Sequence, residues 1–234
     1  SFSQFYINLH ASRYIARRFF AGLAFEFQRL LDIDYVTGGI FDQQNFLGKT
    51  PYNVSGIGPS ISYDSRNDAF FPVKGSFAQV YMVRFDKLLG SSYRYTNYVA
   101  DIRKYIRLGY QTILCFQGYT SLNAGHVPLR SLASLGGASG MRGYYGGRYM
   151  DRNQLLLQTE VRIPVYKRFG AVLFGSAGQV SNRLRELAPG EFHMAGGGGI
   201  RFRVNRKEKL NFRLDYGYAN RHQQGFIFQI GEAF

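Results

Sequence analysis

Several residue types that mark common protein classes are missing or scarce in this sequence. Its 234 residues include no tryptophan and a single cysteine, Cys115, so no disulfide can form within the chain. No stretch approaches about 18 consecutive apolar residues, which excludes a transmembrane helix. Acidic residues are also scarce, 15 against 29 lysines and arginines, and the formal net charge is +14.

The excess of positive charge suggests nucleic-acid binding, because phosphate backbones attract basic proteins. Here, however, the cations alternate with apolar residues and form no continuous run, so we expect no nucleic-acid partner. Four basic pairs are interpreted as solvated caps of turns: Arg17-Arg18, Arg103-Lys104, Lys167-Arg168 and Arg206-Lys207.

Aromatic residues and glycine are abundant. Phenylalanine and tyrosine occur 21 and 18 times, and glycine 28 times. A membrane β-barrel uses aromatic residues at its two interfaces and glycine where strands approach closely. The composition therefore favours a barrel over a soluble enzyme.

Polar and apolar residues alternate along most of the chain, which is the period of a β-strand. Near the C-terminal end, for example, Phe212 and Leu214 alternate with Arg213 and Asp215. The alternation predicts about eleven strands of roughly 9 to 12 residues, long enough to cross a bilayer when tilted. They are expected at residues 3–13, 19–28, 53–63, 76–86, 91–105, 110–122, 155–163, 171–178, 195–204, 210–218 and 225–234.

The connections between these strands alternate in length, and all three long loops fall in the same set. Outer-membrane barrels have short periplasmic turns and long extracellular loops, and an even number of strands. The fold class expected is therefore all-β, a transmembrane antiparallel barrel with its C-terminus in the periplasm. Because eleven is odd, we interpret residues 1–234 as the C-terminal part of one barrel domain whose upstream strands are missing from this chain.

A soluble β-sandwich or a lipocalin-like barrel would also alternate. The alternation places several charged side chains on the inward face, and the dry interior of a soluble protein could not accommodate them because burying charge is costly. The charged residues in question are Glu160, Arg162, Arg201, Arg203, Arg213 and Asp215.

The longest segment without alternation, residues 122–153, is the centre of the chain's organisation. A loop of about 30 residues is uncommon in a compact β protein unless it has a function. Gly136, Gly137, Gly140 and Gly143 permit tight, close-packed backbone around Arg142. We expect this loop to fold back into the barrel and to be pinned there by Arg142.

Several motifs now point to a family. Leu135-Gly136-Gly137 and the following Met141-Arg142-Gly143-Tyr144 resemble the Gly-Gly and Val-Arg-Gly-Phe/Tyr motif in the sixth extracellular loop of the bacterial surface antigen (D15) family, the BamA- and TamA-like outer-membrane barrels. Residues 64–75 are similar to a periplasmic turn of that family, and Glu160-Val161-Arg162-Ile163-Pro164 to the strand after the loop. The ending Phe226-x-Phe228-x-Ile230-Gly231-x-x-Phe234 resembles its terminal β-signal.

The resemblance implies a barrel of about sixteen strands, of which this chain holds the C-terminal eleven, including the five that follow the loop. It implies that Arg142 reaches into the lumen and pairs with Glu160. In this family the next strand often carries an aspartate, but this chain has Ser176 there. Glu160 and hydrogen bonds would then contribute more to pinning the loop. We call the residues expected to pin it the lock: Arg142, Gly143, Tyr144, Glu160 and Ser176.

The same resemblance implies a function in assembling or translocating outer-membrane proteins. Unfolded outer-membrane proteins would be the clients, outer-membrane lipids the surroundings, and accessory assembly proteins further partners. Gly231 would weaken the seam beside the last strand, where a client strand could pair. Two alternatives stay open: a barrel that anchors an upstream patatin-like lipase or metallophosphoesterase, and a plain diffusion channel.

No motif in this segment predicts catalysis, a metal site or a cofactor. Gly48-Lys49-Thr50 lacks the upstream glycine of a phosphate-binding loop. The nucleophile elbow Gly-x-Ser-x-Gly does not occur. The four histidines lack metal-ligand spacing; they are His10, His126, His193 and His222.

Overall fold

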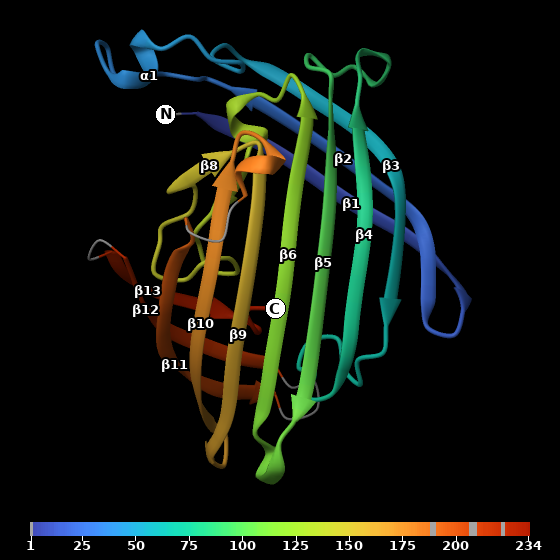
Figure 1. Cartoon of the computed structure of the whole chain (residues 1–234), viewed down its shortest axis with the longest axis vertical. Coiled ribbons are helices and arrows are strands. Elements are labelled where there is room, and N and C mark those ends of the chain that lie inside the picture. The colour runs from blue at the N-terminus through green and yellow to red at the C-terminus, as the bar shows by residue number, and fades with distance from the viewer. Residues whose placement is uncertain (1, 188–190, 206–209, 221–222) are drawn as a thin grey trace.

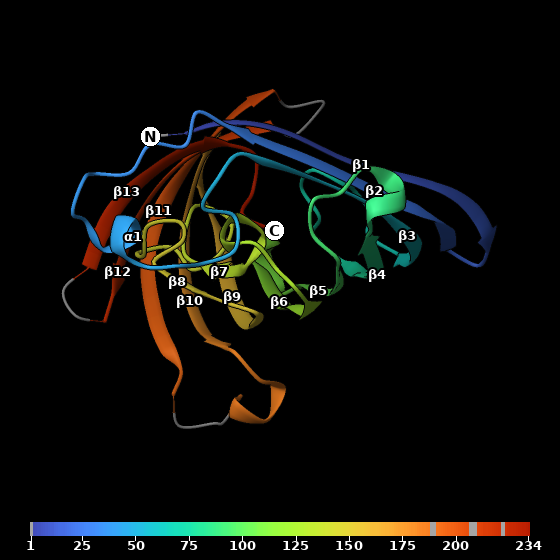
Figure 2. The same ribbon diagram turned by 90° about the horizontal axis from the view of Figure 1, so that it is seen from above.

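The computed structural model describes residues 2–187, 191–205, 210–220 and 223–234, and most of them belong to one antiparallel sheet of eleven strands. The sheet curves around an interior like part of a barrel wall, with β1 and β13 at its two edges (Figures 1 and 2). In spatial order its strands are β1 (Ser3–Ala16), β2 (Phe19–Leu31), β3 (Tyr52–Asp64), β4 (Gly75–Phe85), β5 (Tyr95–Arg107), β6 (Ile113–Gly125), β9 (Asn153–Tyr166), β10 (Phe169–Ser181), β11 (His193–Asn205), β12 (Leu210–Ala219) and β13 (Gln223–Ile230).

The predicted fold class and strand number are therefore confirmed, although several strand ends differ. β5 begins at Tyr95 and not at residue 91, because the 3-10 helix η1 (Lys87–Leu89) and its cap Gly90 turn the chain first. The predicted basic turn at 205–209 falls mostly on residues 206–209, which lie outside the described residues. Among the residues that the structure describes, no helix is both long and apolar enough to cross a bilayer.

The long connection between β6 and β9 is shorter than expected and contains strands of its own. β6 continues to Gly125, because that residue still pairs with Tyr95 of β5. Within the connection, β7 (Ala133–Leu135) and β8 (Tyr149–Asp151) pair as a separate two-stranded sheet. The prediction of a continuous loop over 122–153 was wrong in this respect, since three-residue strands are too short to show a period.

Short helical segments occupy other connections. They are α1 (Ile40–Gln43) between β2 and β3, η2 (Gly109–Gln111) before β6, η3 (Leu129–Ser131) before β7, and η4 (Leu184–Glu186) after β10.

The outer face of the sheet is apolar and exposed. In β9 and β10, Leu157 and Leu173 point outward while Gln158 and Phe174 are buried on the inner face. Large exposed apolar side chains spread over a whole sheet face are expected where the surroundings are lipid. The alternation thus separates a lipid-facing side from an interior, as predicted.

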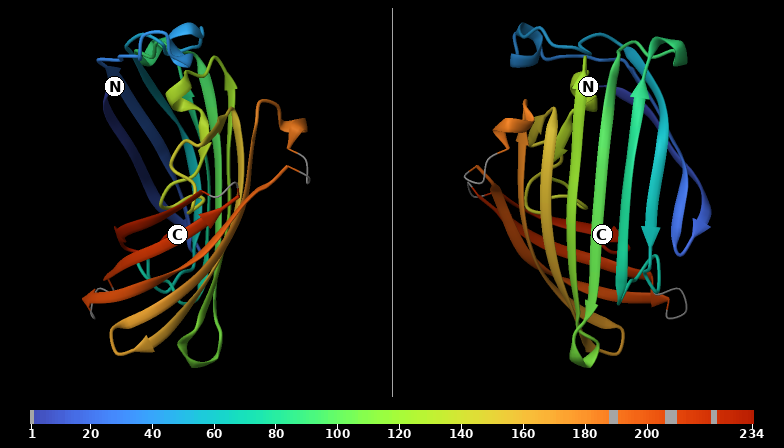
Figure 3. Two further views of the ribbon diagram at one scale, coloured as in Figure 1. Left: turned by 90° about the vertical axis from the view of Figure 1, so that its left-hand side faces the viewer. Right: turned by 45° about the vertical axis from the view of Figure 1, so that its right-hand side comes forward.

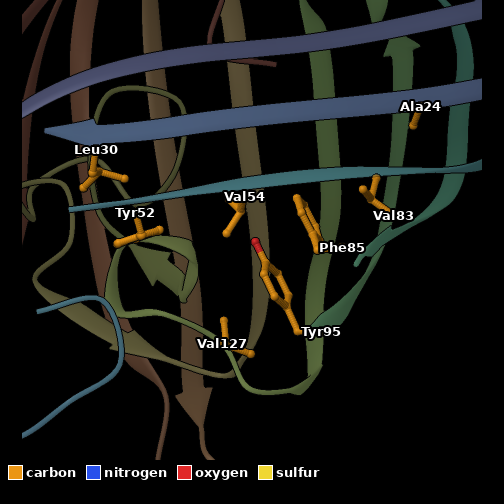
Figure 4. Close-up of a cluster of buried hydrophobic side chains, with 8 residues drawn as sticks. All are labelled: Ala24, Leu30, Tyr52, Val54, Val83, Phe85, Tyr95 and Val127. Carbon is orange, nitrogen blue, oxygen red and sulfur yellow. The ribbon is translucent and has the colours of Figure 1, made fainter. Parts of the chain in front are cut away.

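The inner face is not uniformly polar, which differs from the prediction of a water-facing interior. Beneath the long connections, inward residues of β2 to β5 form an apolar cluster with Val127, which follows β6 (Figure 4). Its members are Ala24, Leu30, Tyr52, Val54, Val83, Phe85, Tyr95 and Val127. The rings of Phe85 and Tyr95 stack with centroids 4.1 Å apart. Periodicity shows which residues share a face, but not whether a loop will cover that face.

The C-terminal residues leave the sheet and enter the interior. β13 ends at Ile230, and Gly231 takes a φ of +94°, a backbone conformation that glycine adopts readily. Phe234 is buried beside Tyr105 and Ile113. The expectation of a strand over residues 225–234 was therefore wrong at its end, because the turn at Gly231 redirects the last residues inward.

We expect a charged residue on the outer face to destabilise the barrel more, the deeper it lies in the membrane. Leu173 lies within β10 and is 62% exposed, whereas Val165 lies near the end of β9 and is 65% exposed. Replacing Leu173 with arginine should destabilise the full-length barrel in lipid vesicles by about 2–4 kcal/mol, and replacing Val165 with arginine by only about 0–1 kcal/mol. Urea titration of the vesicle-inserted protein measures both values, and equal losses would contradict the depth argument.

Candidate functional site

The connection between β6 and β9 turns inward and packs on the wall of the sheet (Figures 1 and 2). Its turns use left-handed glycines, with φ of +106° at Gly136, +95° at Gly137 and +110° at Gly143. The connection buries Leu135, Met141 and Tyr144, which pack against three residues of the wall: Leu156, Ala195 and Ala219. We call residues 133–151 of this connection the inward loop.

One close backbone contact sets where the inward loop meets β12. A Cβ atom at Gly217 would lie 2.5 Å from the main-chain nitrogen of Gly143, and one at Gly143 would lie 3.1 Å from the carbonyl carbon of Tyr218. The first distance is too short for a side chain on Gly217 to fit without moving backbone, and the second leaves little room for one on Gly143. The glycine at each of these positions therefore permits the chains to touch directly.

Arg142 lies beside this contact and is the centre of a buried ion cluster. Its Nη2 is 2.7 Å from Oε2 of Glu160 on β9, and its Nη1 donates to Oδ2 of Asp215 on β12 at 2.7 Å. The Arg142 side chain is 1% exposed and both carboxylates are fully buried. A guanidinium can satisfy two carboxylates at once because its donors form a planar fork.

The ring of Phe174 on β10 covers the same guanidinium. The ring centroid lies 3.6 Å from Cζ of Arg142, within range of a cation–π interaction, which gains strength when water is excluded. Arg142 therefore bridges β9 and β12 through charge and contacts β10, which lies between β9 and β11 in the sheet, through its aromatic face.

A second arginine joins this centre to the C-terminal residues. Arg201 of β11 places Nη1 2.5 Å from Oδ1 of Asp215 and Nε 3.1 Å from Oε2 of Glu232. Arg162 of β9 lies 2.7 Å from Glu160 and donates to the main-chain oxygen of Phe234 at 3.0 Å. The turned-in end of the chain is thus held by the same cluster as the inward loop.

Arg213 is the fourth buried arginine and contacts both the loop and β13. Its Nη2 donates to the carbonyl of Ala138 in the inward loop at 2.9 Å and also to Gln229 of β13. Its Nη1 lies 3.7 Å from Asp215. The residues in this cluster, which we call the ion cluster, are Arg142, Arg162, Arg201, Arg213, Glu160, Asp215 and Glu232.

The structure places the residues predicted for the lock as follows. Arg142 and Glu160 are in direct contact, and Tyr144 is buried below Gly143, with its hydroxyl 3.3 Å from the carbonyl oxygen of Met194. Ser176 is elsewhere, because its hydroxyl donates to the carbonyl of Ala195 on the paired strand β11 at 3.3 Å. Gly140 lies in the loop tip, where an added Cβ would sit 3.0 Å from the carbonyl oxygen of Gly136.

Two contributors to this cluster were not assigned to the lock from the sequence. Asp215 was expected only to face the interior, and Phe174 was not singled out. Asp215 is the second acid of Arg142, although it lies on β12 and not on the strand next to β9. The available signal was its place as an inward-facing acid on β12, where it alternates with Leu214 and Tyr216.

The residues predicted for the terminal β-signal occupy the edge strand. Phe226, Phe228 and Ile230 are 74%, 67% and 60% exposed. β13 pairs with β12 along one side, from Phe212 opposite Ile230 to Ala219 opposite Gln223. In the described part of the chain, the strand order ends at β13, and none of the described strands pairs with its other side.

The remaining candidates form no second site. Lys49 folds back on α1 and donates to the carbonyl of Asp42 at 2.5 Å, and Cys115 is buried in the apolar cluster around Phe234. Among the described residues no group of histidine, cysteine or acidic side chains could hold a metal ion. His222 lies outside these residues.

Replacing Arg142 with alanine should release the inward loop while the barrel stays inserted. Two buried carboxylates would lose a partner, which costs roughly 3–5 kcal/mol. Trypsin should then cleave the full-length, membrane-inserted protein within residues 133–151, for instance after Arg148. Replacing the exposed Arg94 with alanine is the matched control and should leave the loop protected; protection that persists in the Arg142 variant would show that the ion pairs do not hold the loop.

Comparison with known proteins places this architecture in a family. Residues 8–234 match the model of the Omp85 superfamily domain. A solved structure, BamA from Haemophilus ducreyi lacking POTRA domains 1–3, superposes with a TM-score of 0.64 at 15% identity, and the match covers 92% of this chain and 50% of that one. This chain thus spans about half the length of that structure. No curated protein sequence matches it.

The family match covers nearly all of the strands described above, and it supports a location in the bacterial outer membrane. The eleven-stranded sheet with its inward loop is the C-terminal part of a BamA-like barrel fold. The chain belongs to the Omp85 superfamily.

Proposed function

We propose that this chain is the barrel part of an outer-membrane assembly or translocation protein, in which an arginine-pinned inward loop supports a client-pairing edge at β13. The observation that carries the proposal is the ion cluster, which connects the inward loop, the three wall strands β9, β11 and β12, and the C-terminal residues in one buried unit. We expect no catalytic chemistry in this segment.

The connection lengths support an orientation for this barrel. The turns at 17–18 and 167–168 are short, whereas the connections after β2, β6 and β10 are long. In outer-membrane barrels the short turns face the periplasm, so β13 would end on that side. Unfolded clients and accessory assembly proteins would then approach from the side where the free edge of β13 ends.

The ion cluster would serve to fix the wall next to this edge. Arg213 contacts Ala138 in the loop and Gln229 in β13, and Glu232 accepts from Asn211 at 2.6 Å. Each contact links β13 or the residues after it to elements that Arg142 holds in place. The edge strand is therefore supported from inside, while its other hydrogen-bonding side would lie at the proposed seam, where a client strand could pair.

The turn at Gly231 would limit how far a client strand can pair. Backbone pairing needs an extended partner, and β13 stays extended only from Gln223 to Ile230. Beyond it the nitrogen of Gly231 donates to the carbonyl of Asn211 at 2.8 Å and the chain turns inward. A client strand adding to this edge by β-augmentation would therefore have at most the length of β13 as its template.

Removing the guanidinium of Arg142 should reduce assembly activity. In vesicles that contain the full-length protein, Arg142→Ala should lower the rate of client insertion at least tenfold, the effect of about 1.4 kcal/mol. Arg142→Lys should give a partial loss, because one ammonium cannot bridge Glu160 and Asp215 bidentately. Arg148→Ala, a change in the same loop outside the ion cluster, is the control.

The outcome that contradicts this proposal is an Arg142→Ala protein whose loop is cleaved by trypsin but whose insertion rate is unchanged. A plain channel would instead show altered conductance with no effect on clients. An anchor for an upstream enzyme would show neither change.

Client pairing at β13 should be visible as cross-links. In a Cys115→Ser background, single cysteines placed along β13 at Gln224 and Gln229 should form disulfides with a cysteine in the terminal strand of an unfolded client. The same cysteine at Ser60 of β3 is the control, because β3 has a strand on each side. Equal cross-linking at β3 and β13 would remove the support for an edge-specific site.

A further inference from the structure

Charge is distributed unequally between the two ends of the sheet. At the short-turn end, the described connections 17–18, 65–74, 108–112 and 167–168 contain six cations and one acid: Arg17, Arg18, Arg66, Lys74, Lys167 and Arg168 against Asp68. At the other end, the described connections contain nine cations and seven acids, the acids being Asp32, Asp34, Asp42, Asp86, Asp151, Glu186 and Glu191. The excess of positive charge outside the strands is thus concentrated at the short turns.

The backbone at two of these turns gives a second, independent observation. Arg17, Arg18 and Lys167 have φ of +47°, +76° and +48°, the left-handed region that disfavours residues with a long side chain. Two-residue hairpin turns of this kind ordinarily use asparagine and glycine. The chain places arginine and lysine where other residues would fit with less strain, which indicates that the charge itself is used.

Aromatic side chains accompany both turns on the lipid-facing side. Beside Arg18, Phe19 pairs in register with Tyr63, and their ring centroids are 5.0 Å apart. Beside Lys167, the exposed Tyr166 lies opposite Phe169.

The ring of Phe169 approaches Phe202 of β11 with centroids 5.2 Å apart, and Nζ of Lys167 lies 4.9 Å from the centroid of Tyr166. Figure 3 shows the β1–β2 and β9–β10 hairpins extending from the sheet with no helix covering their ends. Aromatic rings of this kind occupy the boundary between hydrocarbon and headgroups.

We propose that the turns at 17–18 and 167–168 are binding sites for the phosphate groups of anionic phospholipids in the leaflet that faces the short turns. Cations directly beyond an aromatic girdle lie at the depth of the phosphates, and each Lys or Arg at an anionic membrane surface adds to the attraction. The sequence alone suggested that these basic pairs are solvated caps of turns. Such caps would not require arginine and lysine in a left-handed backbone conformation. The proposal rests on the membrane location of the barrel and not on its assembly activity.

The test compares lipid binding by the full-length protein and by a variant whose turns keep their shape. In this variant Arg17→Asn and Arg18→Gly suit a turn with two left-handed residues, and Lys167→Gly and Arg168→Asn suit a turn whose first residue is left-handed, so folding should be preserved. Native mass spectrometry of the detergent-solubilised protein then measures the binding of phosphatidylglycerol and of phosphatidylcholine. We expect the wild-type protein to prefer phosphatidylglycerol and each removed cation to weaken that binding about fivefold.

The matched control removes four cations from the other end: Lys87→Gln, Arg94→Gln, Arg183→Gln and Arg185→Gln, all at exposed residues. It should keep the preference for phosphatidylglycerol. Inorganic phosphate at equal concentration should not displace the lipid, since the site would use the rings and the acyl chains as well. Equal binding of the two lipids by the wild-type protein, or an equal loss in the control variant, would overturn the proposal.

Discussion

A single buried guanidinium holds the interior of this barrel segment together. Arg142 is brought into the sheet by a loop that starts and ends at the rim, and there it meets carboxylates from β9 and β12 and a ring from β10. A charge in such a place is stable only when its partners are fixed in advance, because desolvating it costs several kcal/mol by itself. The seated loop is therefore stable only where β9 and β12 present both carboxylates in register, and Arg142 in turn ties these two strands together.

The interior consequently has two different halves. On the β2–β5 side, the long connections cover apolar side chains such as Val54 and Tyr95, and polar contacts such as the hydrogen bond from Ser131 to Gln28 join this packing. On the β9–β13 side, charge and hydrogen bonding dominate, and the C-terminal residues are part of the same network through Glu232 and Phe234. The half next to the free edge is thus the half held by directional interactions, which resist sliding of strands better than apolar contacts do.

Much of this fold was accessible from sequence because its strands alternate so regularly. The number of strands in the large sheet and its lipid-facing side both follow from a period of two. The contact between Arg142 and Glu160 followed from a resemblance between motifs. Asp215 as the second acid did not, because a loop residue can reach any strand whose inner face it overlies, and periodicity gives faces without distances. Ser176 was named from the same resemblance, but its hydroxyl donates to the carbonyl of Ala195 on β11.

The turn at Gly231 also shows which features could be predicted from the sequence and which could not. Gly231 indicated a place where the strand could bend, and the structure has a left-handed residue there. The direction of the bend depends on where Glu232 finds cations, namely Arg201 and Arg162. These partners lie on other strands of the sheet, so only the assembled wall defines them.

The contact between Gly143 and Gly217 has a consequence for how the loop can leave its seat. Tyr216 and Tyr218 point to the exposed side of β12, so the neighbours of Gly217 on the inner face are Asp215 and Ala219. A slip of the loop by two residues along β12 would press its main chain against one of these side chains. Because Gly217 has no side chain, the loop fits against β12 only at this residue. The loop can move away from β12, but it cannot slide along the strand. Release is therefore an all-or-none event, with one seated position and no intermediate stops.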